Sequence, residues 1–384
     1  MRQGLQSVSV RDVARRAGVS ISTVSRVLGG SAPVSAELRA RVMQAVEELG
    51  YRPNAHARGL RLGRTGIIGL LVPDVSNPFF GELARVIEVS ASRAGYNVLL
   101  CNSQNEAARE RQYLDLLQSQ RVDGLLVVAS SLQRSDLERF GRATGARVVA
   151  MDRKIEGFEG PWVGSDPLPG CREAVEHLVA LGHRRIGIVR GPVGVLASEE
   201  RYQAMVRALE ERGLSPSRAW TWAGEYTFET GARAGARLAR CRPGERPTAV
   251  ICGSELAAFG LIQAVEEAGL RVPDDLSVVG YDNTPFSAVC RPPLTVIAQP
   301  IERIGQVATR TLLRLLQAPL RRQPEPLMRM PGMGEAPRPA PGERRARSVA
   351  LPTRLVVRQS TTAVPSPDAP TRGRRGGSDG VGHA

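Results

Sequence analysis

The chain has 384 residues, enough for more than one domain, and its 52 basic and 38 acidic residues give a net charge of +14. The excess charge lies at the ends, since residues 1–64 and 318–384 each carry +7 while residues 65–317 are neutral. No apolar stretch could span a membrane, the N-terminus lacks an apolar leader, and the five cysteines are widely spaced. We therefore expect a cytoplasmic protein with no membrane partner, no metal and no cofactor.

Two short helices joined by a tight turn are predicted near the N-terminus, over residues 12–17 and 21–28. Gly18 can adopt a positive φ and should end the first helix, and the Ser20 hydroxyl can cap the second. This arrangement is typical of a helix-turn-helix unit, whose second helix reads base edges in the DNA major groove. The basic charge of this segment is suited to neutralising phosphates.

The second helix should bury one face and expose the other. Val24, Val27 and Leu28 recur at helical spacing and must be buried. The exposed face then consists of Ile21, Ser22, Ser25 and Arg26. Arg26 matches the two acceptors of a guanine, whereas Ile21 can make only apolar contacts, for example with a thymine methyl group. The alternative is an ordinary helical packing module whose polar face has no partner.

A third helix is predicted over residues 35–49, with Ser35 as its cap. The basic segment 54–60 follows and contains one large apolar residue, Leu60. A segment with a single leucine cannot bury a face by itself, so it should become ordered only against a partner. The alternative is a plain basic linker.

The run DVARRAGVSISTVSRVL, followed by LGYRPNAHARGL, resembles the lactose-repressor/galactose-repressor family of bacterial transcription regulators. The resemblance extends to about residue 362 and implies that Ile21, Ser22 and Arg26 face bases. It also implies phosphate contacts by Ser9, Ser20, Ser25, Ser35 and Asn54. Ala57 and Leu60 would belong to a hinge helix that folds on operator DNA, with Leu60 wedged into the minor groove.

From residue 65 onward, short apolar strands alternate with amphipathic helices. The predicted strands are 66–72, 97–101, 123–128, 146–150, 185–189, 248–252 and 276–280. The predicted helices are 79–94, 106–119, 135–143, 170–181, 199–212, 228–240 and 255–268. Alternation of this kind predicts α/β architecture with parallel sheets covered on both faces. The two series favour two doubly wound subdomains with a cleft between them, as in the periplasmic-binding-protein-like core that the resemblance implies.

Polar and aromatic residues follow the predicted strands, where ligands bind in open α/β sheets. The effector-binding candidates are Asp74, Phe79, Asp152, Arg201, Ser254, Asp282 and Ile301. Guanidinium and carboxylate groups suit the vicinal hydroxyls of a sugar, and the resemblance implies that Arg201 and Asp282 bind the effector. The alternative for each is an ion pair or a helix cap in the cleft wall. The family commonly has Asn-Asp where Ser254 and Glu255 stand, which predicts an atypical effector or a different binding geometry.

We predict a helix-turn-helix DNA-binding domain (1–53), a hinge (54–64), an effector-binding core (65–362) and a disordered tail (363–384). Residues 318–348, rich in Pro, Gly and Arg, are predicted to be a disordered insertion, and 349–361 should supply a closing strand. One recognition helix reads a half-site, so a homodimer on palindromic double-stranded operator DNA is expected.

The predicted function is a sequence-specific transcription regulator, and more narrowly a repressor, whose operator affinity is set by a small sugar-like effector. No nucleotide-binding, hydrolase or metalloprotease motif is present, so we do not expect an enzyme. The alternative is a cytoplasmic solute-binding module with a vestigial DNA-binding unit.

Overall fold

The computed structural model describes residues 8–29, 34–51, 64–317 and 348–364. The N-terminal unit contains three helices, α1 (Val10–Ala17), α2 (Ile21–Gly29) and α3 (Ala36–Glu48). Their shared core is formed by Val13, Ala14, Ala17, Val24, Val27, Val42 and Ala45. The predicted turn is confirmed, because Gly18 adopts the left-handed conformation (φ 64°) and the Thr23 amide donates to the Ser20 hydroxyl at 3.1 Å.

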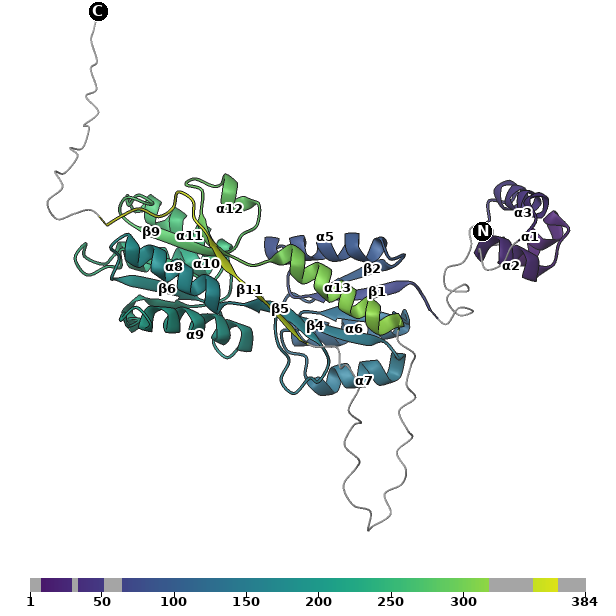
Figure 1. Cartoon of the computed structure of the whole chain (residues 1–384), viewed down its shortest axis with the longest axis horizontal. Helices are drawn as coiled ribbons and strands as arrows, with labels where there is room; N and C mark the ends of the chain where they lie inside the picture. Colours follow the sequence, from purple (N-terminus) through teal and green to yellow (C-terminus); the bar gives the residue numbers. More distant parts are fainter. Residues whose placement is uncertain (1–7, 30–33, 52–63, 318–347, 365–384) are drawn as a thin grey trace, which may run out of the picture.

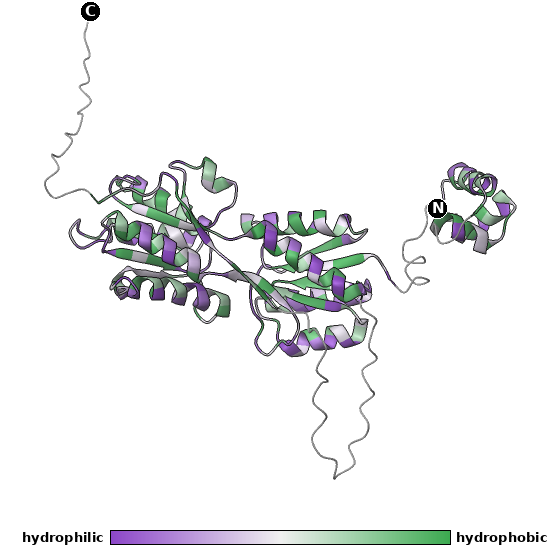
Figure 2. Ribbon diagram, in the orientation of Figure 1, coloured by the Kyte–Doolittle hydropathy of each residue, from purple (hydrophilic) through white to green (hydrophobic). Residues whose placement is uncertain are grey.

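The remainder forms two α/β subdomains, each built on a six-stranded sheet (Figure 1). The first sheet has the order β11-β5-β4-β3-β1-β2 and the second β12-β10-β9-β8-β6-β7. All pairings are parallel except β12 with β10. Apolar residues concentrate on the strands and polar residues on the outer faces of the helices (Figure 2), as expected for sheets covered on both sides.

The first subdomain contains β1 (Ile67–Val72), α5 (Pro78–Ser92), β2 (Asn97–Asn102), α6 (Ala107–Ser119), β3 (Gly124–Val127), α7 (Arg134–Thr144), β4 (Arg147–Met151), β5 (Trp162–Asp166), α13 (Ile301–Gln317) and β11 (Val349–Pro352). The second contains α8 (Leu168–Ala180), β6 (Ile186–Arg190), α9 (Leu196–Glu210), the short 3-10 helix η1 (Arg218–Trp220), β7 (Thr221–Ala223), α10 (Phe228–Ala239), β8 (Ala249–Cys252), α11 (Glu255–Glu267), β9 (Ser277–Asp282), α12 (Phe286–Val289), β10 (Thr295–Ala298) and β12 (Arg354–Val356). None of the helices in these described segments is long and apolar enough to cross a membrane.

All seven predicted strands and all seven predicted core helices are present, with ends shifted by a few residues. The closing segment differs from the prediction, because residues 349–361 form two short strands instead of one. β11 joins the first sheet and β12 joins the second. The predicted insertion 318–348 lies outside the described residues except for Ser348.

Within the described residues the chain crosses between the subdomains three times, after β5, after β10 and between β11 and β12. Thr353, which is 2 % exposed, ties two of these crossings together. Its hydroxyl donates to the carbonyl of Asp166 at 2.9 Å and accepts from the Gly170 amide at 3.0 Å. The two subdomains are therefore joined by a compact, hydrogen-bonded hinge.

The first described residues of the core are fixed to the first subdomain. Both carboxylate oxygens of Asp123 accept backbone amides, from Thr65 at 2.9 Å and from Gly66 at 2.8 Å. Arg64 donates to the Leu316 carbonyl in the last turn of α13 at 2.8 Å, where a cation also complements the helix dipole. The other end of α13 follows directly on Gln299 and Pro300.

Candidate functional site

The structure places three of the predicted base-reading side chains on the solvent-facing side of α2. Ile21 is 44 % exposed, and Ser22 and Arg26 are also exposed, while Ser25 is half-buried. Val24 and Val27 on the opposite side are buried, so this helix is held from behind and its outer surface is free. This is the geometry that a recognition helix requires.

The serines assigned to phosphate contacts have local roles at helix starts. The Ser9 hydroxyl donates to Asp12 at 2.6 Å, and the Ser35 hydroxyl accepts the Leu38 amide at 3.3 Å. Such caps fix the ends of helices from which phosphates are often bound. The hinge residues Asn54, Ala57 and Leu60 lie outside the described residues.

A cavity of about 240 Å³ lies between the two subdomains. Six of the seven predicted effector-binding residues line it: Asp74, Phe79, Asp152, Arg201, Ser254 and Asp282. The seventh assignment needs correction, because Ile301 is 6 % exposed and packs into the hydrophobic core of the first subdomain at the start of α13. Gln299, two residues earlier, lines the cavity instead.

Arg201, on α9, is held in place from several sides. Its Nη1 donates to the Gly253 carbonyl at 2.6 Å and lies 3.9 Å from Oδ1 of Asp282. Its guanidinium carbon lies 4.0 Å from the ring centroid of Tyr281 and 4.9 Å from that of Tyr226. A planar cation stacked on aromatic rings keeps a fixed orientation, and its remaining N–H groups stay available for a ligand.

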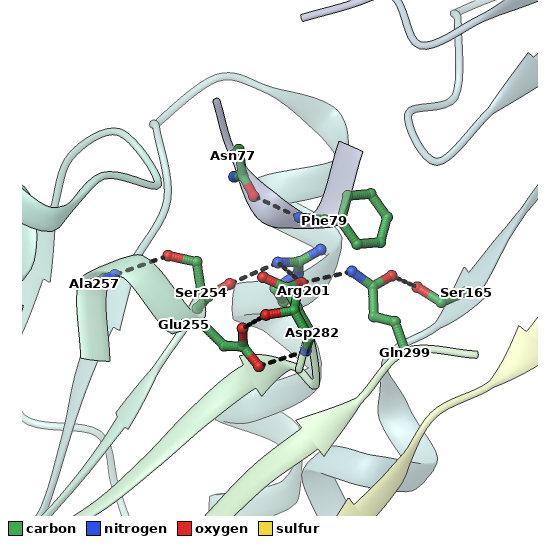
Figure 3. A network of polar contacts seen from close by, with 11 residues as sticks. Asn77, Phe79, Ser165, Arg201, Ser254, Glu255, Ala257, Asp282 and Gln299 are labelled. Atoms are coloured by element: carbon green, nitrogen blue, oxygen red, sulfur yellow. Dashed lines mark hydrogen bonds and ion pairs between the residues drawn. The ribbon is translucent and has the colours of Figure 1, made fainter. Parts of the chain in front are cut away.

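Asp282, at the end of β9, faces Arg201 and is 5 % exposed (Figure 3). Its Oδ1 accepts from Nε2 of Gln299 at 2.7 Å, and Oε1 of Gln299 accepts from Ser165 at 2.6 Å. Burial raises the pKa of Asp282, although Arg201 and Gln299 favour its ionised form. Since Ser165 and Gln299 border two of the subdomain crossings, this network connects the cavity to the hinge.

Glu255, the first residue of α11, supports the backbone that follows Asp282. Its carboxylate accepts both the amide (2.7 Å) and the hydroxyl of Thr284 (Figure 3). Residues 282 and 283 both have positive φ, 96° and 70°, so this turn needs such support. Burial raises the pKa of Glu255 to about 7, and the neighbouring Asp282 raises it further. Ser254 caps α11 by accepting the Ala257 amide at 3.2 Å.

Several cavity residues were not predicted from the sequence. They are Gln104, Asn105, Val195, Ala197, Ser198, Glu225, Tyr226 and Thr227. Glu225 to Thr227 follow β7, a three-residue strand too short to be recognised by its apolar pattern. With these included, four carboxylates line the cavity (Asp74, Asp152, Glu225 and Asp282) against the two guanidinium groups of Arg153 and Arg201.

A helical DNA-reading unit joined to a two-subdomain core with a polar cleft defines a ligand-responsive DNA-binding regulator. Residues 9–54 match the model of bacterial regulatory proteins of the lacI family, and residues 175–334 match a periplasmic binding protein-like domain. The ribose operon repressor of Halalkalibacterium halodurans is 37 % identical over 309 residues, covering 80 % of this chain and 90 % of that protein. The chain belongs to the lacI family of DNA-binding transcription regulators.

Other relatives agree. The HTH-type transcriptional repressor PurR of Proteus mirabilis is 38 % identical, covering 79 % of this chain and 89 % of that protein. A lac repressor dimer bound to operator and the anti-inducer ONPF superposes with a TM-score of 0.77 at 28 % identity, covering 93 % of this chain and all of that one. A LacI family regulator from Enterococcus faecium with bound ribose gives 0.65 at 28 % identity, covering 78 % and 100 %. These relatives are transcription regulators, and the solute-binding alternative is not favoured.

Proposed function

We propose that this regulator is a homodimeric repressor of a palindromic operator, and that a small neutral sugar in the inter-subdomain cavity controls its operator affinity. The observation that carries the proposal is the network of Arg201, Asp282 and Gln299, which faces the cavity between Phe79 and Tyr226. Guanidinium and carboxylate groups bind vicinal hydroxyls, and aromatic rings cover the apolar face of a sugar ring.

The charge of the cavity narrows the ligand class. Four carboxylates against two guanidinium groups disfavour a phosphorylated or acidic sugar, because an anion would be placed in a field of its own sign. A ribose operon repressor and a regulator with bound ribose are among the relatives. D-ribose is therefore the first ligand to test.

A coupling route follows from the two walls of the cavity, which belong to different subdomains. A ligand that contacts both walls stabilises one subdomain arrangement, and so shifts the population of operator-competent molecules. α13 begins beside Gln299 at the cavity and ends at the Leu316 carbonyl, which accepts from Arg64 where the core begins. A movement of α13 would therefore reach the segment that leads to the helix-turn-helix unit.

The homodimer is supported by exposed apolar side chains on the second subdomain. Phe286 and Val289 of α12 are 55 % and 68 % exposed, and a groove lined in part by Phe259 and Ile262 lies nearby. Two recognition helices are also needed to read both halves of a palindrome. Sedimentation velocity should give the mass of a dimer for the native chain and of a monomer for Val289→Glu. A native monomer at micromolar concentration would contradict this part of the proposal.

The effector assignment is tested by calorimetry of the full chain with D-ribose and a panel of neutral sugars. Asp282→Asn should weaken binding by about tenfold or more, because a hydrogen bond to a charged group is lost. Glu210→Gln, an exposed change at the end of α9, serves as the control and should bind like the native chain. Gel-shift titration of a palindromic operator library with and without the sugar then tests control of operator affinity. Operator binding that ignores the bound sugar would contradict the proposal.

A further inference from the structure

Lys154 is the only lysine in the chain, and it forms an ion pair across the cleft. It lies on the loop after β4 in the first subdomain, and its Nζ is 2.6 Å from Oε1 of Glu200 on α9 in the second subdomain. Among the ion pairs of the described residues, this one alone joins the two subdomains. The side chains are 45 % and 37 % exposed, so the pair lies at the rim of the cleft.

The pair is adjacent in sequence to cavity residues on both walls. Asp152 precedes Lys154 by two residues, and Glu200 directly precedes Arg201. The intervening Arg153 anchors its loop to the first subdomain by donating to Ser130 at 2.7 Å and Asn105 at 3.2 Å. Lys154 itself contributes no surface to the cavity wall as described, and neither does Glu200.

The ammonium group is also directed from below. Its Nζ lies 5.0 Å from the ring centroid of Trp162, the first residue of β5, which is 8 % exposed. A cation over an indole face is attracted by the ring quadrupole. Lys154 is therefore held between an aromatic ring of its own subdomain and a carboxylate of the other.

We propose that Lys154 and Glu200 are positioning residues for the effector: their ion pair holds the two walls at the separation at which Asp152 and Arg201 engage one ligand. This inference rests on the proposed function of the cavity. Because the pair is partly exposed, its effect should be modest and reduced by salt.

Charge reversal tests the positioning role. Lys154→Glu and Glu200→Lys should each weaken D-ribose binding about two- to five-fold at low ionic strength. The double exchange, Lys154→Glu with Glu200→Lys, should recover most of that loss, which a purely structural defect would not do. Glu210→Lys makes the same charge change at the far end of α9 and should leave binding unchanged. Equal losses in the double exchange and the single variants would overturn the proposal.

A second measurement detects the bridge without any ligand. Carbodiimide activates a carboxylate and joins it to an amine in direct contact, with loss of water. With one lysine in the chain, mass spectrometry should find a Lys154–Glu200 isopeptide bond in the native protein that disappears in Glu200→Gln and fades in high salt. Absence of this bond in the folded native chain would overturn the bridge itself. A chain that forms the bond but binds no sugar of the panel would contradict the proposed function, and with it the affinity role of the pair.

Discussion

The exposed position of Arg26 determines what its removal should do. The side chain lies on the outer surface of α2, next to exposed Ser22 and Ile21, and is not needed for the buried face of Val24 and Val27. Arg26→Ala should therefore leave the helical unit folded while relaxing specificity at one base pair and costing about 1–3 kcal/mol of binding free energy. Gel-shift titration on operators mutated one position at a time measures this. A uniform loss on every sequence would instead identify Arg26 as a phosphate contact.

The buried carboxyl of Glu255 predicts a pH-dependent stability. Its pKa is about 7 in the folded chain against an ordinary value of 4.5, so the folded state retains a proton that the unfolded state loses. The associated stability is fully present below pH 4.5 and is lost as the pH rises through 7. Lowering the pH from 8 to 6 should raise the free energy of unfolding contributed by this group by about 1 kcal/mol.

Denaturant titrations at the two pH values, with Glu255→Gln as the matched variant, isolate this contribution. The amide keeps the shape of the side chain but does not ionise, so the difference between native and variant chains should vary with pH as stated. A difference that stays constant between pH 6 and 8 would contradict the prediction.

Among the elements, the pair α10 and α11 is packed closely enough to require glycine. A Cβ on Gly260 would lie 1.9 Å from the Phe228 carbonyl oxygen, and one on Gly231 would lie 1.8 Å from the Ala257 carbonyl oxygen. Both neighbours are backbone atoms that cannot turn aside. Gly260→Ala should therefore lower the free energy of unfolding by about 3 kcal/mol or more, measured by chemical denaturation.

The control for this prediction is Gly244→Ala, on an exposed loop where a Cβ would meet no atom within 4 Å. That change should leave stability within about 0.5 kcal/mol of the native value. Similar losses in the two variants would show that close helix contact is not the cause.

The same scale explains how much could be predicted. Strands buried on both faces are continuous apolar runs, such as 67–72 and 249–252, and they stand out in the sequence. β5, β7 and β10 were missed, since β5 ends in Gly-Ser-Asp and the others have only three or four residues. The split of 349–361 into two strands depends on contacts of Thr353 with residues nearly two hundred positions away, which no local pattern records.

The site was predictable to the extent that it lies at recognisable strand ends. Asp74, Asp152 and Asp282 follow strands seen in the sequence, and all three line the cavity. Tyr226 was missed along with its short strand β7, and Ile301 was assigned to the cavity by resemblance although its apolar side chain is used in the core at the start of α13. Local pattern therefore gives the edge at which a ligand binds, while tertiary packing decides which neighbouring side chain faces it.

For the whole molecule, Thr353 is the residue whose loss should be felt in both subdomains. Thr353→Val keeps the volume but removes the hydroxyl that bonds Asp166 and Gly170, leaving buried groups without a partner. The core should lose about 1–3 kcal/mol of unfolding free energy, while Thr353→Ser, which keeps the hydroxyl, should lose less. Chemical denaturation followed by tryptophan fluorescence measures both, and equal losses would contradict a hydrogen-bonding role.

The last two strands have a consequence for how this protein ends its life. β11 covers the outer side of β5 and β12 covers the outer side of β10, so eight consecutive residues seal one margin of each sheet. A protease that removed them would uncover two rows of unpaired amides and carbonyls at once, which are templates for intermolecular β-pairing. A single cut ahead of Val349 should thus convert a soluble regulator into a nucleus for aggregation instead of leaving two independent halves.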